Sequence, residues 1–125
     1  MRQLFVLLAA AFLFNTVQAQ EDAEEYIEVL PEDAQKCVLP ASPDAISEEA
    51  TYDQLKEAKA QIATFQAGVA VFRECLSAAE ANPDNTAGNK QAIVSSFNYS
   101  VDMEERVAVR FNEAIRNYKE RQASQ

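Results

Sequence analysis

The segment LKEAKAQIATFQAGVAVFRECLSAA, from Leu55 to Ala79, places an apolar residue at every third or fourth position along its whole length. This alternating spacing brings the apolar side chains onto one face of an α-helix and forms a heptad seam, which needs a partner helix. The seam consists of Leu55, Ala58, Ile62, Phe65, Val69, Phe72, Leu76 and Ala79. Thr51 and Gln54 have the spacing of a capping box, so the helix is predicted to begin at Thr51 and to end before Pro83.

A second helix is predicted from Asn89 to Arg121, where the same alternation of spacings recurs. Its seam positions are Val94, Phe97, Val101, Glu104, Ala108, Phe111, Ile115 and Tyr118, and Val107 and Ala114 widen the apolar stripe on one flank. Glu104 is the one polar member, and we expect it to pair with a basic side chain across the hairpin or to lean toward the rim. Two long helices joined by a short loop form an antiparallel hairpin. The sequence therefore predicts an all-α fold, with a coiled-coil-like helical hairpin over residues 51–125.

The N-terminus has the three parts of a cleavable signal peptide. Arg2 supplies a positive charge, residues 4–14 form an uncharged apolar run, and residues 17–19 read Val-Gln-Ala, which suits a signal peptidase. A membrane anchor needs about 20 apolar residues, so this run is too short to be one. We expect residues 1–19 to be removed between Ala19 and Gln20, which leaves a soluble exported protein.

The chain has two cysteines, Cys37 and Cys75, and no histidine. A zinc site has no histidine to complete it, a redox pair is expected as Cys-x-x-Cys, and a lipid anchor needs its cysteine at the position of Gln20. In an oxidising compartment we therefore expect a structural disulfide between Cys37 and Cys75. The disulfide is expected to pin an extended segment, residues 37–50, over the hairpin groove as a third layer. The apolar side chains of that layer are Val38, Leu39 and Ile46.

Residues 20–36 hold seven acidic side chains and one basic side chain, Lys36. Such a charge density predicts a flexible or loosely docked arm. The few apolar residues within it leave two interpretations open, a short piece laid against the helices or a docking motif for a partner. Prolines at 31, 40 and 43 predict an extended chain over residues 31–46.

The net charge excludes some classes of partner. Arg2 is the only charged residue within 1–19, so its removal leaves 10 basic and 20 acidic residues and a net charge of −10. A charge of this size repels nucleic acid and anionic lipid. We therefore expect no nucleic-acid partner and no membrane association after signal removal.

No catalytic, metal-binding or cofactor-binding constellation is predicted, and we expect a protein that is not an enzyme. Histidine, the usual general base, is absent, and no phosphate-binding loop or nucleophile motif occurs. Adjacent acids such as Glu104 and Glu105 point in different directions on a helix. They therefore do not face each other across a cleft, as paired catalytic carboxylates do.

Four pieces of the chain carry a resemblance to a known group of proteins. They are Cys37, the run TYDQLKEA from Thr51, the run FRECL from Phe72 and the run FNEAIRNYK from Phe111. The chain resembles small exported helical proteins of Gram-negative bacteria that contain two cysteines. The resemblance implies a periplasmic setting and brings no activity with it.

Two hypotheses of function follow. The first is a non-enzymatic envelope protein that binds another protein or associates with itself, because a long apolar seam in a thin fold favours association. The alternative is a periplasmic chaperone or stress-type binder of unfolded clients. That alternative requires an exposed apolar patch, which Tyr99, Met103 and Val107 would have to form.

Overall fold

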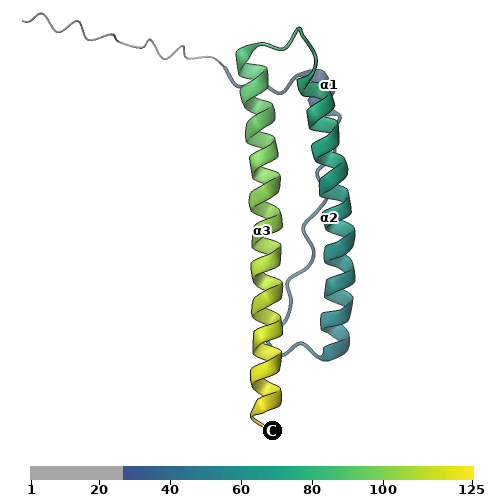
Figure 1. Cartoon of the computed structure of the whole chain (residues 1–125), viewed down its shortest axis with the longest axis vertical. Helices are drawn as coiled ribbons and strands as arrows, with labels where there is room; N and C mark the ends of the chain where they lie inside the picture. The colour runs from purple at the N-terminus through teal and green to yellow at the C-terminus, as the bar shows by residue number, and fades with distance from the viewer. Residues whose placement is uncertain (1–26) are drawn as a thin grey trace, which may run out of the picture.

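The computed structural model describes residues 27–125, which form three helices: α1 (Glu32–Gln35), α2 (Tyr52–Glu80) and α3 (Ala87–Ala123). Helices α2 and α3 run antiparallel and pack along their length, and the chain before α2 follows the groove between them (Figure 1). The predicted all-α hairpin, with its N-terminal segment pinned by a disulfide, is confirmed. The predicted signal peptide, the processing site between Ala19 and Gln20, and the start of the acidic arm lie outside the described residues. Within residues 27–125, no helix has the length and apolar character needed to span a membrane.

Both long helices begin with the same pair of reciprocal hydrogen bonds between side chains and backbone amides. Thr51 Oγ1 accepts a hydrogen bond from the Gln54 amide at 3.3 Å, and Gln54 Oε1 accepts one from the Thr51 amide at 2.9 Å. This is the predicted capping box, which satisfies two amides that the first helical turn leaves without partners. Thr86 and Asn89 form the same reciprocal pair, at 3.1 and 3.0 Å. Helix α3 therefore begins at Ala87, slightly before the predicted Asn89.

The seam predicted for α2 is confirmed by burial. Seven of its members are buried and the eighth, Ile62, is half-buried. Val69 is fully enclosed, with 0% of its surface exposed. It packs with Phe65 and with Val107 of α3. The regular spacing therefore identified the face of α2 that contacts α3.

The seam predicted for α3 is rotated relative to the observed one. The buried row consists of Ile93, Ser100, Val107 and Ala114, at intervals of seven residues. Three members of the predicted row are at least 37% exposed, and they are Val94, Phe97 and Val101. The prediction failed here because a serine interrupts the buried row, whereas the neighbouring row has an uninterrupted apolar start.

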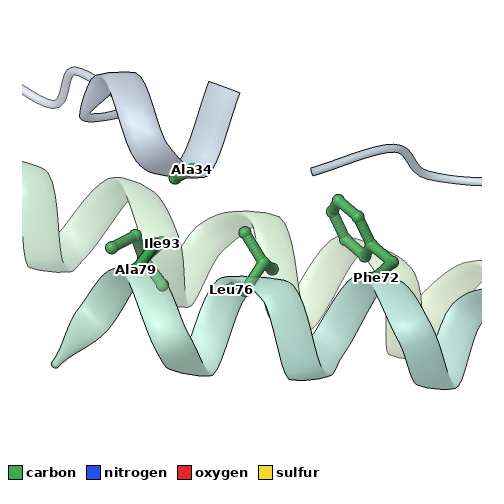
Figure 2. Close-up of a cluster of buried hydrophobic side chains, with 5 residues drawn as sticks. All are labelled: Ala34, Phe72, Leu76, Ala79 and Ile93. Atoms are coloured by element: carbon green, nitrogen blue, oxygen red, sulfur yellow. The ribbon is translucent and has the colours of Figure 1, made fainter. Parts of the chain in front are cut away.

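The segment before the hairpin departs from the predicted extended chain at one place, and there it lies against the helices, which was one of the two interpretations left open. Residues 32–35 form α1, so the prediction of extended chain over 31–46 is wrong there. Ala34 of α1 is 2% exposed and packs with Leu76, Ala79 and Ile93 (Figure 2). A small residue at this position lets the short helix lie close to the hairpin, so this part of the acidic arm is docked.

Residues 37–50, which we call the strap, run along the groove from α1 to the start of α2 (Figure 1). Leu39 and Ile46 are half-buried against hydrophobic clusters of the hairpin, as predicted. Val38 is 79% exposed, so its predicted place in the third layer is wrong. It lies directly between two inward-facing residues, Cys37 and Leu39, and neighbours in an extended chain point to opposite sides.

Two contacts with the hairpin hold the strap close to it. A Cβ atom at Gly68 of α2 would lie 3.1 Å from the Pro40 ring, so the glycine permits close approach of the strap. At the other end, the Arg121 guanidinium donates hydrogen bonds to the carbonyls of Glu48 and Ala50. The strap is thus attached to both helices.

Burial predicts different effects for two valines of α2. Val69→Ala removes enclosed methyl groups and should lower the free energy of unfolding by about 2–3 kcal/mol. Val71→Ala, at a position that is 66% exposed, should lower it by less than about 0.5 kcal/mol. Urea denaturation of the two variants measures both values, and equal losses would contradict the observed orientation of α2.

Reduction of the disulfide should loosen the strap and spare the hairpin. A crosslink that spans 38 residues stabilises a fold by about 4 kcal/mol in the loop-entropy estimate. We expect reductant to lower the melting temperature markedly while circular dichroism retains most of the helical signal at 25 °C. Limited proteolysis of the reduced protein should cut first within residues 37–50. An unchanged melting temperature, or loss of the helix at 25 °C, would contradict this account.

Candidate functional site

The two predicted cysteines form the covalent attachment of the strap. Cys37 and Cys75 are joined by a disulfide with their Cα atoms 5.6 Å apart, a separation typical of such bridges. Cys37 lies just after α1 and packs against the cluster around Ala34, and Cys75 lies in the last part of α2. Because both sulfurs are in the bridge, the cysteines have a structural role and no free thiol remains.

A polar cluster lies in the middle of the α2–α3 contact, where the sequence predicted an apolar seam. Ser100 of α3 is fully buried, and its hydroxyl donates to the Phe97 carbonyl at 2.6 Å. The same oxygen accepts a hydrogen bond from Nε of Arg73 in α2 at 2.9 Å. A serine that bonds to a carbonyl of the preceding turn is satisfied inside a helix. The hydroxyl can therefore occupy a core position at this contact.

The same arginine also explains Glu104. Arg73 Nη2 lies 2.8 Å from Glu104 Oε2, and their side chains are 24% and 29% exposed. Glu104 thus pairs with a basic residue across the hairpin, which was one of its two expected arrangements. The Arg73 guanidinium also lies 5.4 Å from the centre of the Phe97 ring, a cation–π distance. One side chain therefore links three positions of α3.

Sequence reasoning missed Ser100 and Arg73 as members of the contact. The signal that could have found Ser100 is its place in the seven-residue repeat Ile93, Ser100, Val107, Ala114. No comparable signal identified Arg73, because it is one of several basic residues on α2 and its partners lie far along the chain.

The cluster serves structure and shows no chemistry directed at a ligand. Every buried side-chain nitrogen or oxygen in residues 27–125 has a hydrogen-bond partner. Within the same part of the chain, no group of three or more acidic, cysteine or histidine side chains could hold a metal ion. A functional surface must therefore be sought on the outside of the hairpin.

The hairpin has two flanks, and the strap lies on one of them. Small grooves on the strap side are lined by strap residues such as Pro43 and Ile46 together with residues of α2. A groove of about 240 Å³ near the loop end is lined by helix residues alone. We call the flank with this groove the open face. Its residues are Gln66, Arg73, Ser77, Glu80, Val94, Phe97 and Glu104. Val101 belongs to the same face, because it follows Val94 by seven residues, or two helical turns.

The open face carries an apolar row that the fold leaves exposed. Val94, Phe97 and Val101 are 41%, 37% and 40% exposed and are spaced by three and four residues along α3. Phe97 borders the groove between the helices, with Leu76 and Ile93 also in its lining. These three residues begin the row that was predicted to be the seam of α3.

The apolar patch needed for the chaperone hypothesis does not exist as predicted. Tyr99 is 53% exposed, but Met103 is half-buried and Val107 is 4% exposed in the hairpin core. Around Tyr99 lies a shallow groove of about 670 Å³ with acidic and basic side chains. Its charged lining residues are Asp102, Glu105, Arg106 and Arg110. Tyr99, Met103 and Val109 supply the apolar part of its lining, and the charged side chains lie around them.

Comparison of the chain with protein families, with curated proteins and with solved structures finds no match.

Because Ser100 is fully enclosed, a larger apolar side chain at this position should destabilise the fold. Ser100→Leu places a larger apolar residue in an apolar row, yet it should lower the free energy of unfolding by about 1–3 kcal/mol, because the site is already filled. Asn98→Leu, at an exposed position two residues away, should change it by less than about 0.5 kcal/mol. Thermal and urea denaturation measure both. A stabilising Ser100→Leu would show that the contact is not closely packed.

Proposed function

We propose that this chain is an exported, non-enzymatic protein that acts by binding protein, either another protein or a second copy of itself. The observation that carries the proposal is the apolar row on the open face. Val94, Phe97 and Val101 expose between 37% and 41% of their surfaces side by side. Isolated exposed apolar residues are common, whereas a regular row of them on one face is typical of an interaction surface.

Export to an oxidising compartment, such as a periplasm, is part of the proposal. Its support is the predicted signal peptide together with the disulfide between Cys37 and Cys75. Structural disulfides persist where thiols are not kept reduced. The bridge holds the strap against the hairpin, so it would also keep one flank occupied while the other stays available.

Site-specific photo-crosslinking in the producing cells tests this proposal. A photoreactive amino acid at Val101 should give an adduct of higher mass, because that residue lies on the open face. The same amino acid at Val71 serves as the control. Val71 is 66% exposed but lies about 200° around α2 from the buried Val69. Mass spectrometry of the adduct identifies the bound protein, and intact mass shows whether the chain begins at Gln20.

Two outcomes would contradict the proposal. An absence of adducts at Val101, with the variant folded and exported, would remove the open face as a binding surface. Equal yields of the same adducts at Val101 and Val71 would show contacts that are not specific to that face.

A further inference from the structure

We propose that the groove around Tyr99 is a binding site for a small amphipathic carboxylate, whose anionic group lies between the guanidiniums of Arg106 and Arg110. The apolar body of the ligand would lie on Tyr99 and Met103. This groove is separate from the open face, so the inference goes beyond the proposed function. Three observations carry it: the order of the lining residues around α3, the unpaired state of the two arginines, and the apolar floor beside them.

The lining residues of α3 divide into a row next to the strap and an outer rim. The row has spacings of four, three and four residues and consists of Tyr99, Met103, Arg106 and Arg110. At 3.6 residues per turn, the other three members lie within about 40° of Arg110, which contacts the strap. Asp102 and Glu105 lie about 80° and 140° from Arg110 around the helix, on the side away from the buried row. The part of the groove next to the strap is therefore basic and apolar, and the acidic side chains form its rim.

The two arginines have N–H donors that the fold does not use. Arg110 Nη2 donates to Ser42 Oγ of the strap at 3.1 Å, and Arg110 Nε donates to the Arg106 carbonyl at 3.4 Å. A guanidinium has five N–H donors, so three of them remain for another acceptor. The two ion pairs within residues 27–125 involve other residues. Neither guanidinium therefore has a carboxylate partner in that part of the chain.

A carboxylate suits this pair of arginines. Guanidinium groups bind carboxylate and phosphate through paired hydrogen bonds. Arg106 and Arg110 are about 6 Å apart along the helix axis, so one anion between them can accept from both. Asp44 of the strap lines the neighbouring groove and not this one. The acidic rim repels a singly charged carboxylate less than a doubly charged phosphate, which favours the carboxylate.

The charge of the whole chain makes the local arrangement decisive. The chain has a net charge of −9, so its long-range field repels anions. An anion that binds must therefore be held by the two guanidiniums at short range. Binding of a carboxylate would accordingly be specific to this groove.

The apolar floor determines the shape of the ligand. Tyr99 is 53% exposed, and Met103 is half-buried against the cluster that contains Val107. Along the helix axis, Met103 and Tyr99 lie about 8 and 14 Å from the midpoint of the arginine pair. A thioether and a phenol ring both make favourable contacts with an aromatic ring. A ring joined to a carboxylate by a short aliphatic chain spans this distance, and the groove of about 670 Å³ has room for it.

Titration of the purified, oxidised protein with two matched probes tests this inference. Phenylhexanoate and phenylhexanamide share the ring and the chain, and only the first is charged. Nuclear magnetic resonance of the isotope-labelled protein follows the backbone amides during the titration. We expect phenylhexanoate to give saturable shifts at Ser42 and over residues 99–110. Its dissociation constant should be at least about tenfold lower than that of the amide, because only the carboxylate makes charge-assisted hydrogen bonds.

Three variants separate the parts of the site. Arg106→Gln should raise the dissociation constant of phenylhexanoate about tenfold and leave that of the amide unchanged. Arg116→Gln removes the same charge from an exposed position of α3 outside the groove lining, so it should change neither. Tyr99→Ala should weaken both probes, since it removes part of the apolar floor. Circular dichroism shows whether each variant is folded, and Arg110→Gln replaces Arg106→Gln if that variant is not.

Four outcomes would overturn the inference. They are an absence of saturable shifts with phenylhexanoate, equal affinity for the two probes, equal weakening by Arg116→Gln, and shifts centred on Phe97 of the open face. The photo-crosslinks at Val101 report on the open face alone. A failure of the carboxylate site therefore leaves the proposed function intact, and a failure of the crosslinks leaves this site intact.

Discussion

The structure depends on one geometric constraint: two packed helices can bury only the arc that each presents to the other, which leaves two flanks of the hairpin uncovered. A small domain needs more enclosed surface than one seam supplies. In this chain the strap covers the first flank, where Leu39 and Ile46 pack against hairpin clusters. The second flank is left with an apolar row from α3. The proposed function follows from this difference, because the strap covers one flank and leaves the other exposed.

The rotation of α3 about its own axis decides which apolar row remains outside. Ser100 occupies a fully enclosed position that a larger side chain would not enter without displacing its neighbours. Its hydroxyl bonds to the Phe97 carbonyl and to Arg73, and Arg73 also pairs with Glu104. A buried polar group in a helical contact often sets register, because only one alignment satisfies it. The cluster therefore both holds α2 against α3 and directs Val94, Phe97 and Val101 to the surface.

The strap combines a covalent, a steric and an electrostatic role. The disulfide attaches its beginning to α2, and the Arg121 guanidinium attaches its end through the carbonyls of Glu48 and Ala50. Gly68 allows Pro40 to lie close to α2 between these points. The strap also carries three acidic residues, Asp44, Glu48 and Glu49, and no basic residue. One flank of the hairpin is thus covered by an acidic segment.

Most of the secondary structure could be predicted from the sequence, because its causes act over a few residues. The capping pair Thr51 and Gln54, the repeat of α2 and the loop at Pro83 are all local patterns. The only two cysteines in the chain allow a single intramolecular pairing. The rotation of α3 was different, because two neighbouring rows of that helix both carry apolar residues at helical spacing, one at intervals of seven and one at alternating intervals of three and four. Which of them faces α2 depends on Arg73, 27 residues before Ser100. Contacts across the hairpin also place α1 on α2 and turn Val38 outward. Periodicity along one helix specifies that a face is apolar, and only the packing of the second helix against it decides which row is buried.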